Sequence, residues 1–561
     1  MQYQDKIVTA LEKVTGIEAK KLTKCMEKCK IQKEGDISIL VIKMEREGMK
    51  MGKEELMEKL KNEVGDMMEM KYKNNYINIK INKDEIINEN VKVLNEIINK
   101  GEEYGKNEIG KNKKIIIEYS SPNIAKPFHI GHLRSTIIGN YVKKIHEYTG
   151  HEVISINYLG DWGKQYGLLA LGYNLFGNKK ELETDAIKHL FNLYVEINKM
   201  AKEDDSINEQ AREYFKKMEE GNEEVLSMWN SFKELSMKEY KKIYDRLHVN
   251  FDVFSGESLT IPYLPSVIDK LNEKQLLCKS NDATVVDLSS YNLGKALIKK
   301  SNGTTLYLTR DIAEACNRYE KYKFDKMYYV VGDQQDFHFK QLFTILSLMD
   351  YDWASCCHHI PFGMVQGMST RQGTVVFLDE ILDKTQLLIK EVMISKNFSL
   401  TSMDQISREL ALSSIIIQDL SSKRLLGYKF SWDRMTSLDG YSGAYLQYTH
   451  ARLFSLYSKS NITLNIHADL TLLIESQAIL LIQHLSLFPN IILSTLNNLE
   501  PFLLVSYLFE LAHFISSALH VLQVKGSLVP LAESRLLLFH SSRIVLSNGL
   551  SLLGLIPLEC M

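Results

Sequence analysis

The sequence predicts an α/β fold: a doubly wound parallel sheet with a small α+β unit before it and an all-helical bundle after it. Two strand–helix units follow each other within about sixty residues from Lys113. The chain before them is rich in Lys, Glu and Asn, and the chain after about residue 385 is apolar at helical spacing. Because 561 residues exceed one ordinary core, we expect three domains, 1–105, 106–384 and 385–561.

The first of these units alternates helices and strands. After a first amphipathic helix, ISILVIKM (37–44) predicts a strand, and a helix begins at Lys53. YINIKIN (76–82) predicts a second strand, followed by a helix through Ile98. Residues 100–105, KGEEYG, are typical of a linker.

A strand, a loop and a helix follow in KKIIIEYSSPNIAKPFHIGHLRSTIIGN. Lys113 to Tyr119 is an apolar, β-branched run, and we expect the helix to begin near His132. The N–H groups and the dipole of a first helical turn favour an anion above the strand end. Gly131 allows close approach to the backbone, and His129 and His132 are placed to donate to phosphate oxygens. This pattern predicts a phosphate loop.

The second strand–helix unit is HEVISINYLGDWGKQYGLLALGY, with its strand over 151–158. Charged helical segments over about 178–250 indicate an insertion of two or three helices packed on the sheet. The sheet is then expected to resume with ATVVDLSS (283–290), TLYLT (305–309) and KMYYVV (326–331).

Two of these later segments carry candidate site residues. We expect a crossover helix from Asp311, with that residue as its N-cap. Gln335 and His338 follow the last of these strands, at the rim where open α/β sheets bind ligands.

Composition excludes several classes of protein. The chain holds 68 Lys and Arg against 70 Asp and Glu, so no global basic field marks a nucleic-acid partner and any such contact must be local. Seven scattered cysteines without a secretory leader predict reduced thiols in the cytoplasm. The run Cys356–His359 lacks paired zinc-ligand spacing, so we expect no structural metal. We expect no membrane span.

The motifs together resemble those of the arginyl-tRNA synthetases, a class I aminoacyl-tRNA synthetase family, in its eukaryotic cytoplasmic form. SSPNIAKPFHIGHLRSTIIGN and NYLGDWGKQ carry the resemblance in the first half of the chain, and the terminus NGLSLLGLIPLECM carries it at the end. GMVQGMSTRQGTVVFLD resembles the family's form of the mobile KMSKS loop. Gly367 and Thr370 stand where other class I enzymes have Lys; the family's substitute is a Lys before the HIGH sequence, and Lys126 stands there.

The resemblance implies ligation of L-arginine to tRNA(Arg) with ATP, through an arginyl-adenylate and with Mg²⁺ on the phosphates, by a cytoplasmic monomer. It implies catalytic roles for Lys126, His129, His132 and Arg371. It implies arginine binding by Glu118, Ser121, Asn123, His132, Tyr307, Asp311 and Gln335. It implies ATP binding by His129, Gly131, His132, His338, Met364, Val365, Met368 and Ser369. It also implies tRNA outer-corner contacts from residues 1–105 and anticodon contacts from residues 385–561.

Arginine selection also has a physical basis in the residues themselves. A guanidinium is planar and always charged, so its pocket needs carboxylates at the base. Glu118 and Asp311, with the Tyr307 hydroxyl, are expected to supply these groups on adjacent strand ends. Lysine, a point charge, would fill such a fork poorly.

Three alternatives stay open at this point. A tRNA-binding protein with impaired catalysis is suggested by Gln372, where relatives often have Lys, and by Leu519, Gln523 and Cys560 near the terminus. A small-molecule nucleotidyltransferase would share the phosphate loop but not the long helical segment after it. In that segment Tyr445 and Tyr448, spaced i,i+3, stack on RNA bases if exposed and belong to the core if buried; the resemblance favours tRNA contact.

Overall fold

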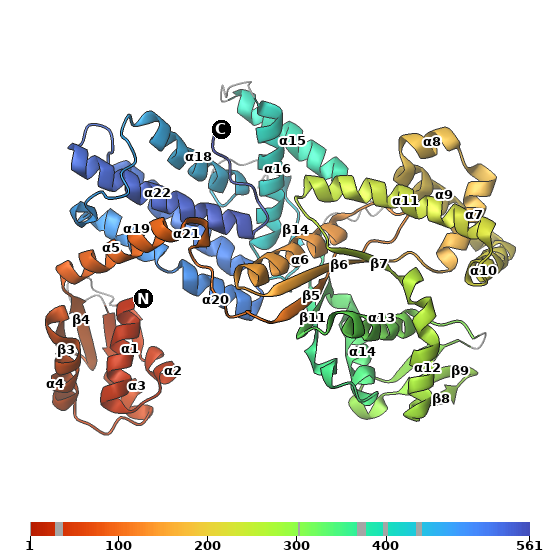
Figure 1. The fold of residues 1–561 in the computed structure, drawn as a ribbon, viewed down its shortest axis with the longest axis horizontal. Coiled ribbons are helices and arrows are strands. Elements are labelled where there is room, and N and C mark those ends of the chain that lie inside the picture. The colour runs from red at the N-terminus through yellow and green to blue at the C-terminus, as the bar shows by residue number, and fades with distance from the viewer. Residues whose placement is uncertain (1, 29–36, 301–302, 367–376, 396–401, 433–439) are drawn as a thin grey trace.

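The structure is a computed structural model that describes residues 2–28, 37–300, 303–366, 377–395, 402–432 and 440–561. Figure 1 shows the N-terminal unit at one end of an elongated molecule and the central parallel sheet in the middle. A helical arm (residues 164–246) and a small unit (residues 264–348) lie at the other end, and the C-terminal helices pack beside the sheet. The α/β fold with an all-helical C-terminal part is confirmed.

The N-terminal unit packs helices on an antiparallel sheet of order β1-β2-β4-β3. Its elements are α1 (Gln2–Thr15), α2 (Ala19–Thr23), β1 (Met26–Lys28), β2 (Ile37–Leu40), α3 (Val41–Arg46), α4 (Lys53–Val64), β3 (Met68–Lys73) and β4 (Tyr76–Ile81). The prediction of one strand over 37–44 is wrong in its second half. Val41 and Met44 bury one face of α3, and this i,i+3 spacing suits a helix. Strands β1 and β3 were not predicted.

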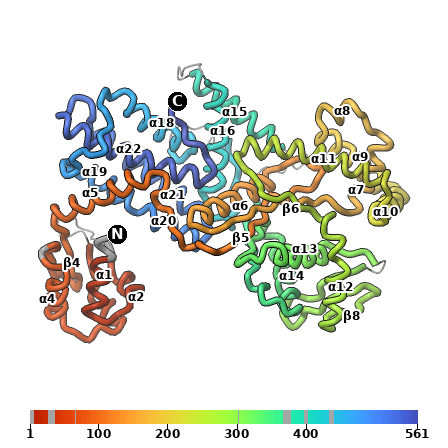
Figure 2. Tube along the Cα trace, in the orientation of Figure 1, coloured from red at the N-terminus to blue at the C-terminus, as the bar shows by residue number. Residues whose placement is uncertain are grey.

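Helix α5 (Lys83–Lys100) leads from this unit to the C-terminal helices and runs along them in Figure 2. The segment expected to be a linker is packed, because Tyr104 is buried and its ring stacks on Phe488 at 6.1 Å between centroids. A Cβ on Gly105 would lie 2.8 Å from the same Phe488 ring, so only glycine fits there.

The central sheet has five parallel strands in the order β12-β11-β5-β6-β7. They are β5 (Lys114–Glu118), β6 (Glu152–Leu159), β7 (Val253–Gly256), β11 (Lys326–Gly332) and β12 (Cys357–Phe362). Ile115, Ile116 and Ile117 are buried on both faces, as a central parallel strand requires. Strand order reverses between β5 and β11, which places the ligand crevice at their carboxyl ends.

Helices cover this sheet and extend from it. They are α6 (Ile130–Tyr148), α7 (Lys164–Phe176), α8 (Lys179–Thr184), α9 (Ala186–Glu203), α10 (Asp205–Glu219), α11 (Glu223–Arg246), α12 (Leu264–Glu273), α13 (Tyr307–Tyr322) and α14 (Asp336–Leu348). The insertion predicted over about 178–250 is helical, but α8 to α11 exceed the two or three helices expected. Tyr240 and Tyr244 on α11 are buried against the phosphate loop and the sheet.

After the insertion, the strand at ATVVD is confirmed but its place in the central sheet is wrong, and the strand at TLYLT is wrong. ATVVD is β9 (Ala283–Asp287), which belongs to a separate antiparallel sheet with β8 (Leu277–Ser280) and β10 (Lys295–Lys299). TLYLT does not form a strand, because helix α13 already begins at Tyr307. Leu308 and Ile312, spaced i,i+4, are buried on one face of that helix, and this burial outweighs the β propensity of the segment. Asp311 therefore lies inside the helix rather than at its N-cap.

The C-terminal helices form a bundle that shares one continuous core with α5 and α6. The elements are α15 (Leu378–Ser395), α16 (Met403–Leu420), α18 (Gly443–Lys459), α19 (Ser476–Leu485), α20 (Phe488–Asn498), α21 (Pro501–Val521) and α22 (Val529–Leu552). Strand β13 (Val365–Gln366), which precedes α15, pairs in parallel with β14 (Tyr428–Lys429), which lies between α16 and α18.

Two bundle segments, Ser476–Asn498 and Pro501–Val521, are long and apolar enough to cross a membrane by composition. The first is two helices, because the chain turns before Phe488 and Pro489 opens α20. The second buries Leu504, Leu508 and other side chains in the bundle. Both segments act as core helices in this structure.

Candidate active site

The two histidines of the phosphate loop cap helix α6. Nδ1 of His129 accepts from the Gly131 N–H at 3.1 Å, and Nδ1 of His132 accepts from the His129 N–H at 3.3 Å. The rings stack at 3.7 Å between centroids. Helix α6 therefore begins at Ile130, two residues before the predicted start. Because each Nδ1 is an acceptor, the hydrogen-bond network assigns the proton of each neutral ring to Nε2.

Burial keeps both imidazoles neutral. It lowers the pKa of His129 and lowers that of His132 well below its usual value, and the nearby charge of Lys126 adds to both shifts. Burial also lowers the pKa of Lys126, whose Nζ lies 5.2 Å from the centroid of the Tyr194 ring. The loop thus offers two Nε2–H donors and one cation at a helix N-terminus, which suits a phosphate group.

These shifts predict a one-sided pH dependence. An unfolded histidine takes up its proton as the pH falls through about 6.5, whereas the folded rings resist protonation. Stability from this source is therefore complete above that pH and is lost below it. Protonation would also remove the Nδ1 acceptors of the cap. We expect adenylate formation to be flat at alkaline pH and to fall on the acid side, as measured by pyrophosphate exchange. An unchanged rate as the pH falls well below 6.5 would contradict the need for neutral imidazoles.

The turn between β5 and α6 has an unusual backbone. Ser120, Ser121 and Ala125 all have positive φ, at 71°, 47° and 59°. Oγ of Ser121 accepts from the Tyr158 N–H at 3.2 Å, and the Asn123 carbonyl accepts from the Tyr240 hydroxyl at 2.6 Å. These contacts connect the turn to β6 and α11. They stabilise the positive-φ backbone conformation, which costs free energy in residues other than glycine.

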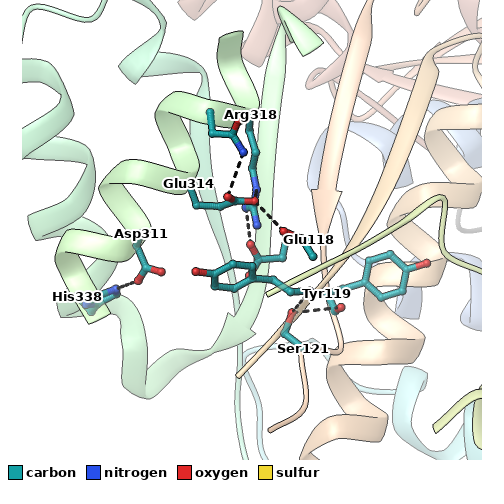
Figure 3. Close-up of polar contacts among 10 residues, drawn as sticks. Glu118, Tyr119, Ser121, Asp311, Glu314, Arg318 and His338 are labelled. Atoms are coloured by element: carbon teal, nitrogen blue, oxygen red, sulfur yellow. Dashed lines mark hydrogen bonds and ion pairs between the residues drawn. The ribbon is translucent and has the colours of Figure 1, made fainter. Parts of the chain in front are cut away.

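A buried acidic cluster lies at the carboxyl end of β5. Glu118 pairs with the Arg318 guanidinium, whose Nε also donates to Glu314 at 3.0 Å (Figure 3). All three side chains are buried. Burial raises the pKa of Glu118, Arg318 counters part of that rise, and the Asp311 and Glu314 carboxylates add to it. Glu118 thus has a cation partner within the chain, which the sequence analysis did not foresee.

Asp311 is the more accessible carboxylate. Its Oδ2 lies 2.7 Å from Nε2 of His338, and about a quarter of each side chain is exposed. The charge of Asp311 raises the pKa of Glu118, so the two carboxylates interact electrostatically, and their joint role in binding arginine stays a prediction. They do not lie on adjacent strand ends, because Asp311 and Tyr307 come from the first turns of α13. Tyr307 is 56% exposed at the rim.

A second buried ion pair completes the cluster. Nη1 of Arg310 donates to Glu257 at 2.6 Å, and burial with the charge of Asp311 raises the pKa of Glu257 to about 7. Arg310, Glu314 and Arg318 repeat every four residues, so they share one face of α13. The four-residue spacing in the sequence could have predicted that Glu314 and Arg318 pair with each other. No residue close to Arg310 in the sequence indicates that its partner is Glu257.

The remaining predicted residues lie around this cluster or outside the described residues. Gln335 is exposed in the turn between β11 and α14, and Met364 is 52% exposed next to the half-buried Val365. Met368, Ser369, Arg371 and Gln372 lie outside the described residues. A hollow of about 830 Å³ opens beside Tyr307 and Arg310.

The two bundle tyrosines differ in exposure. Tyr448 is 43% exposed, whereas Tyr445 is half-buried against the bundle core. Only Tyr448 therefore presents a free ring face of the kind that base stacking needs.

No group of three or more His, Cys, Asp or Glu side chains is placed to hold a metal ion in the part of the chain that the structure describes. The Cys356–His359 run contributes mainly to strand β12, where side chains alternate between the two faces of the sheet.

Comparison with known proteins agrees with this architecture. A family described as tRNA synthetases class I (R), catalytic domain, matches residues 92–432, and the DALR anticodon binding domain matches residues 446–561. The fold and the site therefore define a class I aminoacyl-tRNA synthetase.

Individual relatives narrow this class to one family. The chain is 45% identical to a probable cytoplasmic arginine–tRNA ligase of Dictyostelium discoideum over all of both chains. It is 48% identical to the cytoplasmic arginine–tRNA ligase of Saccharomyces cerevisiae, over 84% of this chain and 80% of the other. The crystal structure of arginyl-tRNA synthetase from Plasmodium falciparum superposes with a TM-score of 0.76 at 25% identity, covering 100% and 99% of the two chains. The chain belongs to the arginyl-tRNA synthetase family.

Proposed function

We propose that this site carries out both half-reactions of arginine–tRNA ligase, the activity of the family to which the chain belongs. One observation carries the assignment: acidic side chains lie at the carboxyl end of the strand that leads into a loop with two neutral imidazole donors. A cation-binding pocket and an anion-binding loop, joined by residues 119–128, suit an amino acid with a guanidinium and a nucleoside triphosphate.

The arginine side chain is assigned to the acidic cluster. Asp311 and the Tyr307 hydroxyl face the accessible side, and the substrate guanidinium would replace His338 as the partner of Asp311. Glu118 would add negative potential from beneath, held in place by Arg318. The α-amino and carboxylate ends are assigned to Ser121, Asn123, Gln335 and His132.

ATP is assigned to the phosphate loop and the neighbouring strand ends. The groups proposed to bind it are His129, Gly131, His132, His338, Met364, Val365, Met368 and Ser369, with Lys126 and Arg371 as cations. Mg²⁺ would arrive on the ATP phosphates as part of the substrate, and no step is assigned to it here.

The first half-reaction needs no general base, because the arginine carboxylate is already a nucleophile. Its oxygen forms a bond to the α-phosphorus while the bond to the bridging oxygen breaks, and pyrophosphate leaves. The protein contributes position and charge stabilisation. The Nε2–H groups of His129 and His132 would donate to oxygens whose negative charge grows in the transition state. In the second step a ribose hydroxyl of the tRNA end attacks the carbonyl and releases AMP.

The other parts of the chain are assigned to the tRNA. We propose that residues 1–105 contact its outer corner and that the helices after 385, with the exposed Tyr448, contact the anticodon. We further propose a monomer that works in the cytoplasm. Sedimentation of the free protein and imaging of a fluorescent fusion test these two statements.

The decisive assay is charging of total tRNA by the purified protein with each of the twenty amino acids. We expect turnover with arginine alone, dependent on ATP. Binding of tRNA without turnover would instead indicate a binding protein with impaired catalysis. Adenylate formation without any tRNA binding would indicate a small-molecule nucleotidyltransferase.

A further inference from the structure

The segment from Pro361 to Gln366 joins the end of strand β12 to strand β13 and runs between the sheet and the bundle. Its Gly363 N–H donates to the Arg424 carbonyl at 2.9 Å. A Cβ on Gly363 would lie 2.5 Å from the Leu425 carbonyl oxygen and 2.8 Å from the Gly427 nitrogen. The segment is therefore packed directly against residues 424–429.

One arginine binds this segment from the helix of the phosphate loop. Arg134 is on α6, two residues after His132, and is 1% exposed. Its guanidinium donates to the carbonyls of Gly363 and Leu426, the latter at 3.0 Å. Its charge faces Asp419 on bundle helix α16, with Nε 3.4 Å from Oδ1 and both side chains 1% exposed.

A second arginine binds the same segment from the bundle side. Nη1 of Arg424 donates to the Pro361 carbonyl at 2.7 Å. The Arg424 backbone N–H donates to Glu500 at 3.1 Å, and its Nε lies 3.6 Å from the other carboxylate oxygen. Glu500 immediately precedes helix α21, so this contact also ends on a bundle helix.

Burial makes the first pair costly. Among the described residues Nε of Arg134 makes no hydrogen bond, so its 3.4 Å separation from Oδ1 of Asp419 is an ion-pair distance only. Burial raises the pKa of Asp419, and besides Arg134 the Tyr428 hydroxyl lowers it. Two charges removed from water at such a distance add little net stability, and apolar side chains of the same size would do as well. The pair is better explained by what it positions than by what it stabilises.

We propose that Arg134 with Asp419 and Arg424 with Glu500 form a clamp that sets the position of residues 361–366 relative to α6. This inference rests on the proposed function, in which Met364 and Val365 form one wall of the ATP site and His132 another. The clamp fixes the spacing of these two walls, and because each arginine is tied to a bundle carboxylate, helices α16 and α21 share control of that spacing. The four residues are positioning residues, since none of them is assigned a contact with ATP.

The test uses the more accessible half of the clamp. We expect Arg424→Ala to raise the Kd and KM for ATP about tenfold, a change of about 1.4 kcal/mol, with the KM for arginine within twofold. Arg424→Lys should recover part of the loss, because one ammonium can reach the Pro361 carbonyl or Glu500 but not both. The charge reversal R424E/E500R should not recover it, since a carboxylate at 424 cannot donate to a carbonyl.

Arg535→Ala is the matched control. Arg535 donates to the Gln523 carbonyl at 2.7 Å and pairs with Glu475, which precedes helix α19, so it repeats the same contacts inside the bundle. Both alanine variants should lower the melting temperature similarly, and only R424A should lose ATP affinity. An ATP Kd for R424A within twofold of wild type, or full rescue by the charge reversal, would overturn the clamp.

Titration calorimetry with ATP is run beside pyrophosphate exchange on the full chain. It reports the ATP Kd whether or not the protein activates arginine. The two hypotheses can therefore fail separately. If the proposed function is wrong, the wild-type protein will bind ATP but show no arginine-dependent exchange.

Discussion

Asp311→Ala is expected to abolish arginine-dependent ATP–pyrophosphate exchange. Asp311 is the accessible carboxylate of the cluster, and the substrate guanidinium would be left underpaired in a buried site without it. Leaving a buried charge without its partner costs about 3–5 kcal/mol, which corresponds to a loss of roughly 10² to 10³ or more in kcat/KM for arginine. Exchange kinetics at varied arginine measure this loss.

Two further variants separate the pocket from its neighbour. Asp311 pairs with His338, so His338→Gln tests whether Asp311→Ala lowers exchange by disturbing ATP binding. We expect His338→Gln to raise the KM for ATP and to leave the KM for arginine unchanged. Glu181→Ala breaks another acid–histidine pair, 2.8 Å to His189 in the helical arm, and should leave exchange unchanged. Near wild-type exchange by Asp311→Ala would refute the pocket assignment.

His129→Asn is expected to lower the rate of adenylate formation by about 10² to 10³, the usual cost of one transition-state donor. Asparagine is a good N-cap and can accept from the Gly131 N–H as the imidazole does. It does not place an N–H where Nε2 stands. The melting temperature should therefore stay near that of wild type while the rate in single-turnover experiments falls.

His129→Ala gives the complementary measurement. It removes the donor and the cap together, so it should show the same loss of rate and an added loss of about 1 kcal/mol of stability. A full rate in His129→Asn would mean that the imidazole serves only as a cap for α6, and the catalytic role of His129 would have to be withdrawn.

The position of Asp311 in the fold could not be predicted from the residues around it. Glu118 and Asp311 were expected on two strand ends, but residues 305–309 include the start of helix α13 because Leu308 and Ile312 are buried on one helix face. A short run of β-branched and aromatic residues is ambiguous between strand and helix until its burial is known. The two acids still interact, because the charge of Asp311 raises the pKa of Glu118.

The sequence by itself determined the strand, turn and helix of the phosphate loop, since an apolar run and capping histidines act within a few residues of each other. It also determined the family, because those motifs are local and specific. Only the tertiary structure decided that Glu118 is held by Arg318, 200 residues away, and that Asp419 and Glu500 pair with the two arginines that bind residues 361–366. Partners so distant are chosen by packing and by the cost of an unpaired buried charge, and neither quantity can be read from neighbouring residues.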